Sequence, residues 1–159
     1  MMCTTIDRRS KNAKGGTQVK HKNASCMLKE YFEANGVIFY QRNAGAMEIF
    51  LLPYNIRKQN IRFNIQIVVY ERNNYSLCRM SFSHELNEDK DYSKDLLNMN
   101  AELIKGRLSV EPDSNQVTYT TTFRLDSNSD VELLYKRHFE ICVSVLASLY
   151  TKNIIKTNE

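Results

Sequence analysis

Hydrophobic positions in this chain follow two periods, and blocks of one period alternate with blocks of the other. Between residues 61 and 70, Ile61, Phe63, Ile65 and Ile67 alternate with Arg62 and other polar residues. A period of two with one polar side is typical of an antiparallel strand that has one wet face. This segment therefore predicts a half-buried strand.

Three other stretches repeat at spacings of three and four residues, which predicts helices. The first begins at Ala24 and ends at Asn35-Gly36, a pair suited to a left-handed C-terminal stop. The second covers about 94–104, with Ser93 as its N-cap, and the third covers about 129–152.

Short apolar runs between turn residues predict the remaining strands. We expect a first hairpin with its turn at 42–45 and with Pro53 ending the pairing, a strand on each side of the turn "ERNN", and a last hairpin around "DSN". The expected strands are 37–41, 46–52, 61–70, 75–82, 106–112 and 116–125. Hairpins dominate this order, so the predicted class is α+β: a twisted antiparallel sheet of about five or six strands with three helices packed on it.

The net charge of +4 belongs to the N-terminal segment. Residues 1–23 hold one acid, Asp7, and six basic residues: Arg8, Arg9, Lys11, Lys14, Lys20 and Lys22. The other 136 residues hold 16 basic and 17 acidic groups, a balance of −1. With few apolar residues to bury, 1–23 is predicted to be a disordered basic arm, and 24–156 a single domain. The arm is interpreted as a solvated tail or untranslated upstream codons, or alternatively as a contact for nucleic acid.

Several classes of protein are disfavoured. No apolar run approaches the roughly 18 residues of a membrane span, and the N-terminus has no apolar signal segment, so we expect a cytoplasmic protein. The four cysteines include no CxxC pair, and Cys26, Cys78 and Cys142 lie among apolar neighbours, where a reduced cysteine acts as a small hydrophobe. The five glycines form no phosphate-binding loop, and no cofactor is expected.

Candidate reactive groups do not form a complete site. The segment after Asn87 resembles a calcium loop but has Tyr92 where glycine is needed. His138 and Cys142 are four residues apart, a spacing that could begin a zinc site, although a core histidine is the simpler interpretation. His84-Glu85 lacks an identifiable nucleophile. We predict no enzymatic activity.

Asn100 is an unusual residue for a helix interior, because its amide competes for backbone hydrogen bonds. It shares an apolar face with Leu96, Met99 and Leu103, which are expected to form a seam between helix and sheet. We predict that Asn100 is buried and bonds the backbone near "KGRLSV", with Gly106 supplying the tight turn, and that Asn98 faces solvent.

The last predicted helix is apolar around most of its circumference. One face should cover the sheet, and the other requires a second subunit or another protein, unless the helix is simply central in a monomer. The candidate interface residues are Leu134, Ile141, Val145 and Leu149.

The helix "LLNMNAEL", the strand and turn "GRLSVEPDSN", a long strand and a closing amphipathic helix resemble the YbjN family of bacterial proteins over 94–150. That family is similar in fold to the type III secretion chaperones. The resemblance implies a dimer that binds protein segments, and the basic arm is not part of the family pattern. We therefore predict a dimeric, chaperone-like protein-binding module, with a nucleic-acid-associated protein that uses the arm as the alternative.

Overall fold

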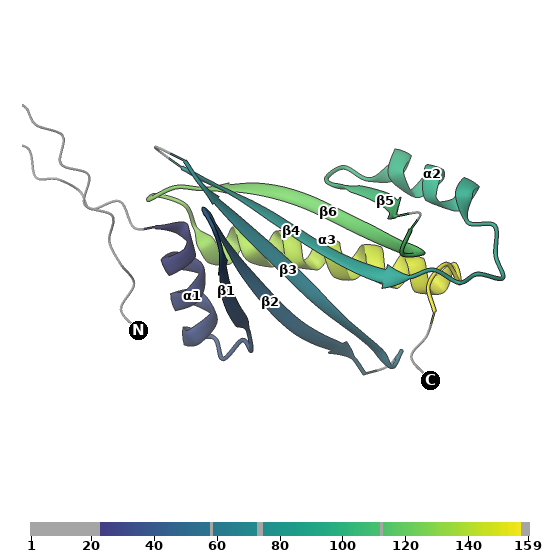
Figure 1. The fold of residues 1–159 in the computed structure, drawn as a ribbon, viewed down its shortest axis with the longest axis horizontal. Helices are drawn as coiled ribbons and strands as arrows, with labels where there is room; N and C mark the ends of the chain where they lie inside the picture. Colours follow the sequence, from purple (N-terminus) through teal and green to yellow (C-terminus); the bar gives the residue numbers. More distant parts are fainter. Residues whose placement is uncertain (1–22, 58, 73–74, 112, 157–159) are drawn as a thin grey trace, which may run out of the picture.

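The computed structural model describes residues 23–57, 59–72, 75–111 and 113–156. Within these ranges the chain forms an open antiparallel sheet of six strands with three helices, an α+β fold as predicted. The strand order is β1-β2-β3-β4-β6-β5, so the sheet joins sequence neighbours except where β4 pairs with β6. Figure 1 shows the sheet in front of the long helix α3, with α1 and α2 near opposite ends of the molecule.

Helix α1 (Ala24–Ala34) lies where its periodicity predicted. The side chain of Asn23 accepts the backbone N–H of Ser25 at 2.7 Å, so it caps the helix, and Gly36 follows the helix with φ +63°. Leu28 and Phe32 are fully buried. These two positions, one turn apart, attach α1 to the core.

The first hairpin joins β1 (Tyr40–Ala44) to β2 (Met47–Ile56) and differs from the prediction. Ala44 pairs with Met47, so the turn consists only of Gly45 and Ala46. The pairing of this hairpin does end before Pro53, at Leu51, but β2 continues past its predicted end at residue 52, and Pro53 lies opposite Asn64 in β3. It is tolerated there because β1 pairs no further than Leu51, which leaves this part of β2 at the margin of the sheet.

The centre of the sheet consists of β3 (Ile61–Glu71) and β4 (Ser76–Glu85), which pair antiparallel. Buried residues in the first part of β3 alternate as the sequence predicted. Strand β4 runs on to Glu85, beyond the predicted end, and Leu86 then makes a bridge with Ile155. The segment after α3 is thus attached to the end of β4.

Helix α2 (Ser93–Glu102) connects β4 to the last hairpin, β5 (Arg107–Glu111) and β6 (Gln116–Leu125). Ser93 is the first helical residue and not the predicted N-cap, which is Tyr92 without a side-chain capping bond. The carboxylate of Asp91 instead accepts the backbone N–H of Ser93 at 3.1 Å. This hydrogen bond lowers the pKa of Asp91.

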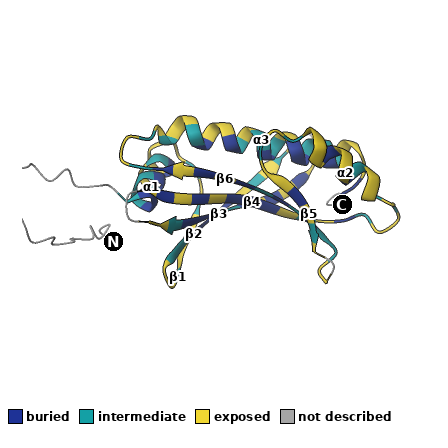
Figure 2. Cartoon of the chain, turned by 90° about the horizontal axis from the view of Figure 1, so that it is seen from above, coloured by how far each residue is buried: buried dark blue, intermediate teal, exposed yellow. Residues whose placement is uncertain are grey.

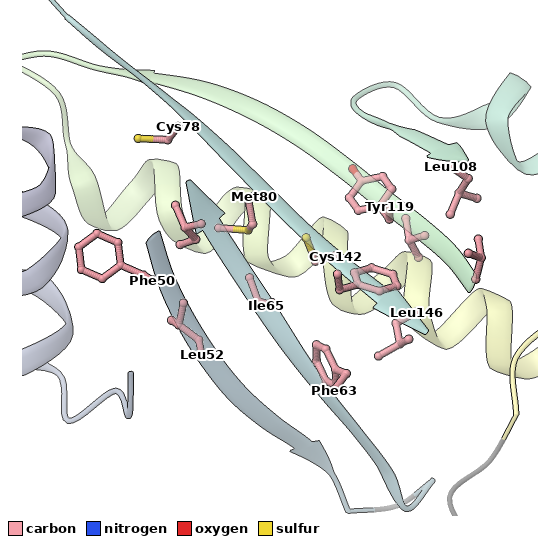
Figure 3. Close-up of a cluster of buried hydrophobic side chains, with 14 of the residues drawn as sticks. Phe50, Leu52, Phe63, Ile65, Cys78, Met80, Leu108, Tyr119, Cys142 and Leu146 are labelled. Carbon is pink, nitrogen blue, oxygen red and sulfur yellow. The ribbon is translucent and has the colours of Figure 1, made fainter. Parts of the chain in front are cut away.

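Helix α3 (Val131–Thr151) runs along one face of the sheet, and Asp130 caps it by accepting the backbone N–H of Leu133 at 2.9 Å. Figure 2 shows the helices on one side of the sheet. The side chains labelled in Figure 3 come from the strands and from α3, and they belong to the buried core between these two layers. The opposite face of the sheet carries no helix of the described chain.

Candidate functional site

The strand β1 forms one edge of the sheet, and part of its backbone has no partner. In the two-residue hairpin, Ala44 and Met47 close the turn as a hydrogen-bonded pair, and such pairs alternate with non-hydrogen-bonded pairs along an antiparallel ladder. The pairs of Gln41 with Phe50 and of Asn43 with Glu48 are then of the second kind. The N–H and C=O groups of Gln41 and Asn43 therefore point away from β2, and within the described chain they make no backbone hydrogen bond.

Exposed side chains accompany these backbone groups. Ile38, just before β1, is 68% exposed, and Tyr40 at its start is 66% exposed. Phe39 between them points inward, with its ring centroid 5.4 Å from that of Phe32 in α1 and 5.8 Å from that of Phe50 in β2. The anchored Phe39 holds this segment against the core, so the two exposed apolar side chains lie beside a fixed strand. We call β1 with Ile38 the free edge.

The opposite edge, β5, is closed at Leu108 by a side chain from α2. The amide nitrogen of Asn100 donates to the carbonyl of Leu108 at 2.9 Å, and the N–H of Leu108 donates to the Asn100 amide oxygen at 2.7 Å. The side chain thus occupies both outward backbone groups of Leu108, as a neighbouring strand would. The prediction that this residue docks the helix on the next strand agrees with these two bonds. The predicted burial was wrong, because Asn100 is exposed at the rim of the sheet.

The rest of the predicted seam lies around this closed edge. Leu96 and Met99 are buried in the core cluster, Leu103 is half-buried against it, and Asn98 is exposed as predicted. Gly106 has φ +79°, and a Cβ at this position would lie 2.5 Å from the Tyr119 hydroxyl. That hydroxyl donates to the carbonyl of Lys105 at 2.8 Å. Gly106 is therefore required by close packing as well as by its backbone conformation.

The predicted interface on α3 is only partly at the surface. Val145 is 5% exposed and Leu149 is 0% exposed, so both belong to the chain's own core and offer no surface to a partner. Leu134 and Ile141 are half-buried beside that core. The idea that α3 is apolar on both sides is corrected accordingly, because its outward side is mostly polar: it carries exposed Glu132, Lys136, Arg137, Glu140 and Ser144, together with exposed Leu133. A polar outward face is what a helix at the surface of a monomer requires.

His138 is a core histidine. It is 1% exposed, its Nδ1 lies 2.9 Å from the Thr121 hydroxyl, and its ring stacks on Phe123 with centroids 4.8 Å apart. Burial, with smaller contributions from the charges of Lys105 and Arg137, lowers the pKa of His138 to about 4. The side chain is consequently neutral at pH 7. Among the described residues no group of three or more His, Cys, Asp or Glu side chains is placed to hold a metal ion.

The cysteines do not form a reactive centre in the described chain. Cys78 and Cys142 are free thiols in the core, and burial raises the pKa of each to about 12. They act as small hydrophobes, as predicted. The prediction that Cys26 in α1 is also a reduced hydrophobe was wrong, because Cys26 is half-buried and disulfide-bonded.

Aromatic side chains hold α1 and α3 to the sheet. The hydroxyls of Tyr54 in β2 and Tyr135 in α3 lie 2.5 Å apart, and burial raises the pKa of both. The ring of Tyr135 also contacts those of Tyr31 and Phe32 from α1. With pKa values above their ordinary range these hydroxyls stay protonated at neutral pH, so the cluster is structural.

The basic arm predicted for 1–23 lies, apart from Asn23, outside the described residues, and so do its six basic side chains. Among the described helices none is both long enough and apolar enough to span a membrane. Comparison of the sequence with models of protein families gave no match, and comparison with curated proteins gave none. Within the described residues the protein is α+β, with an open sheet that has one edge closed at Leu108, one free edge and one face without a helix.

Proposed function

We propose that this chain is a non-enzymatic, cytoplasmic, chaperone-like protein-binding module that receives an extended segment of a partner protein along the free edge. The observation that carries the proposal is the pair of outward backbone positions, Gln41 and Asn43, on an edge strand that nothing in the described chain covers. A segment in strand conformation can complete these hydrogen bonds and extend the sheet.

The side chains of the free edge indicate what the segment should look like. Ile38 and Tyr40 are exposed beside the backbone groups, so apolar side chains at alternate positions of the incoming strand would lie against them. The YbjN resemblance, which implies binding of protein segments and dimerisation, supports the same function. A second copy of the chain that offers its own β1 is one partner with the required chemistry.

A proline variant tests the proposal. Gln41→Pro removes an outward N–H without removing a backbone hydrogen bond of the hairpin. Gln41→Thr keeps that N–H, and both variants lose the hydrogen bond that the Gln41 side-chain amide donates to the Glu48 carboxylate at 3.0 Å. Tagged full-length variants would be used to capture proteins from nuclease-treated host lysate, and the mass of each purified variant would be measured by light scattering. Wild type and Gln41→Thr should retain a stoichiometric partner, or a dimer mass, that Gln41→Pro loses.

Two results would contradict the proposal. Retention of the same partner or dimer by a folded Gln41→Pro variant would show that the free edge is not used. Wild-type protein that is monomeric and captures no stoichiometric protein would remove the protein-binding function itself.

A further inference from the structure

The uncovered face of the sheet carries all the arginines of the described strands. Arg42, Ile49, Val68, Arg79 and Thr122 form one row across β1, β2, β3, β4 and β6. Side chains alternate between faces along a strand, so residues an even number of positions from this row share its face. Those residues include the three other strand arginines, Arg62, Arg107 and Arg124. We call this surface the arginine face.

The charge of the arginine face is one-sided. All five arginines are exposed, while only Glu85 and Glu111, at one end, supply acid on the same face, a balance of +3. Within the described chain, Arg124 has a carboxylate partner, Asp126 at 3.8 Å, and Arg42, Arg62, Arg79 and Arg107 have none. An ordinary solvated surface carries positive and negative side chains in similar numbers, so the excess of arginine on this face requires another explanation.

The choice of arginine also carries information. The described strands contain no lysine, although lysines occur in the helices and loops of the same chain. Lysine keeps a surface solvated as well as arginine does. The planar guanidinium of arginine can in addition donate two hydrogen bonds to phosphate oxygens and stack on aromatic rings. Two arginines of the structure already stack: Arg124 lies 4.2 Å from the centre of the Tyr75 ring and Arg79 lies 5.7 Å from that of Tyr70.

Hydroxyl groups fill the space between these cations. Thr122 lies opposite Arg79, Thr120 lies opposite Arg107, and Ser81 lies opposite Thr120. Within the described chain the Thr120 and Thr122 hydroxyls form no hydrogen bond. They are the kind of small donor and acceptor that recognises a ribose 2′-hydroxyl.

We propose that the arginine face binds single-stranded RNA. The guanidiniums, four of which have no carboxylate partner in the described chain, meet the phosphates. The Tyr–Arg stacks at Tyr70 and Tyr75 provide flat surfaces for bases, and the threonine hydroxyls contact the sugars. The arginines extend from β1 to β5, and Arg42 and Arg79 alone are separated by three strand spacings, roughly 14 Å. The face can therefore follow several nucleotides. The arginine face meets the free edge at Arg42, but Arg79 and Arg124 lie on β4 and β6, away from the β1 backbone of the proposed function, so variants at either place can fail without the other.

The test uses full-length protein and fluorescein-labelled rU15, with binding read by fluorescence anisotropy over a range of salt concentrations. The variant Arg79→Ala/Arg124→Ala should bind about tenfold more weakly or worse. Its log–log salt slope should fall by about 1.4, since each phosphate contact of a single strand contributes roughly 0.7. Arg79→Lys/Arg124→Lys should keep the salt slope of wild type and still bind rU15 more weakly. The positive charges remain, but the ring stacking and the bidentate hydrogen bonds of arginine are lost.

The matched control is Lys136→Ala/Arg137→Ala, which removes two exposed positive charges from α3 on the other side of the sheet. Its affinity should stay within about twofold of wild type, since a distant surface charge steers binding only weakly at physiological salt. Circular dichroism confirms that each variant is folded.

Four results would overturn the proposal. The first is wild-type protein that does not bind rU15. The second is an equal loss of affinity in the arginine-face and α3 variants, which would indicate binding through net charge or through the N-terminal segment. Displacement of rU15 by polyglutamate at equal charge concentration would indicate a site for any polyanion. Binding of dT15 as tightly as rU15 would contradict the assignment to RNA.

Discussion

The two edges of the sheet are treated in opposite ways. At β5, the Asn100 amide takes both outward backbone groups of Leu108, and helix α2 lies alongside. At β1, the corresponding groups of Gln41 and Asn43 meet no described residue, and exposed Ile38 and Tyr40 accompany them. Proteins normally protect edge strands because an open edge recruits other chains. Within the described residues, the β5 edge has a dedicated side chain at Leu108, although the outward groups of Val110 stay open, whereas the β1 edge has no such side chain.

The largest expected effect comes from the glycines that enter the two edges. Gly106→Ala should lower the free energy of unfolding by about 2–4 kcal/mol, because φ is +79° and the new Cβ would meet the Tyr119 hydroxyl at 2.5 Å and the Thr120 carbonyl at 2.6 Å. Gly45→Ala, at φ +63° with nothing within 4 Å of the new Cβ, should cost about 1–2 kcal/mol. Urea unfolding of both variants measures the difference. Equal losses would show that packing at the closed edge adds nothing.

Acid should weaken the layer that supports β6, next to the closed edge. The pKa of His138 is about 4 in the folded protein against an ordinary value near 6.5, so the unfolded chain binds this proton more readily. The contribution of neutral His138 to the free energy of unfolding is complete above pH 6.5 and is lost as pH falls towards 4. The expected loss between pH 7 and pH 5 is about 2 kcal/mol.

His138→Gln, which can still bond Thr121, is the control for this pH dependence. Stability curves of the variant and of wild type should run parallel above pH 7 and diverge below it. If the two curves stay parallel down to pH 5, the buried neutral histidine is not the cause.

The closing side chain itself has a smaller expected effect. Asn100→Ala leaves the N–H and C=O of Leu108 without their partner and should cost about 1–2 kcal/mol. Asn98→Ala, two residues away and exposed, should change stability by less than about 0.5 kcal/mol. Chemical denaturation of the pair gives both values. A loss at Asn98 as large as that at Asn100 would contradict edge closure as the cause, because the higher helix propensity of alanine should by itself stabilise both variants.

The smallest effect on stability is expected at the free edge. Gln41→Pro should change the free energy of unfolding by less than about 0.5 kcal/mol, because the backbone group that it removes is unused in the described chain. Thermal and urea unfolding of Gln41→Pro and Gln41→Thr would compare the stabilities of the two variants. A large loss for proline alone would mean that this N–H already has a partner within the protein.

Local sequence patterns predict the central strand of the sheet and the docking of α2 near Gly106. The alternation from Ile61 to Ile67 predicts the central strand, and an asparagine inside an apolar helix face predicts a docking bond near Gly106. These signals are local because each depends on residues a few positions apart. The exposure of Asn100 was not predicted, since being at the rim depends on β5 being the last strand.

Other features depend on distant partners and were missed. The pairing of β4 with β6 joins segments about 40 residues apart, and no periodicity specifies it. Pro53 is acceptable only because β1 ends opposite Leu51, a fact about the neighbouring strand. The free edge itself follows from the strand order. For α3 the prediction considered the number of apolar residues and overlooked the spacing of the charged ones. Charged residues recur every four positions at Glu132, Lys136 and Glu140, which indicates an outward face.

The most direct measurement of the contrast between the edges is residue-resolved amide hydrogen exchange of the full-length protein, at a concentration where light scattering shows a monomer. The account predicts strong protection at the Leu108 amide, which donates to Asn100, and near-intrinsic exchange at the Gln41 and Asn43 amides. In Asn100→Ala, protection at Leu108 should be lost while the β1 amides are unchanged. Slow exchange at Gln41 and Asn43 in the isolated protein would contradict an open edge at β1.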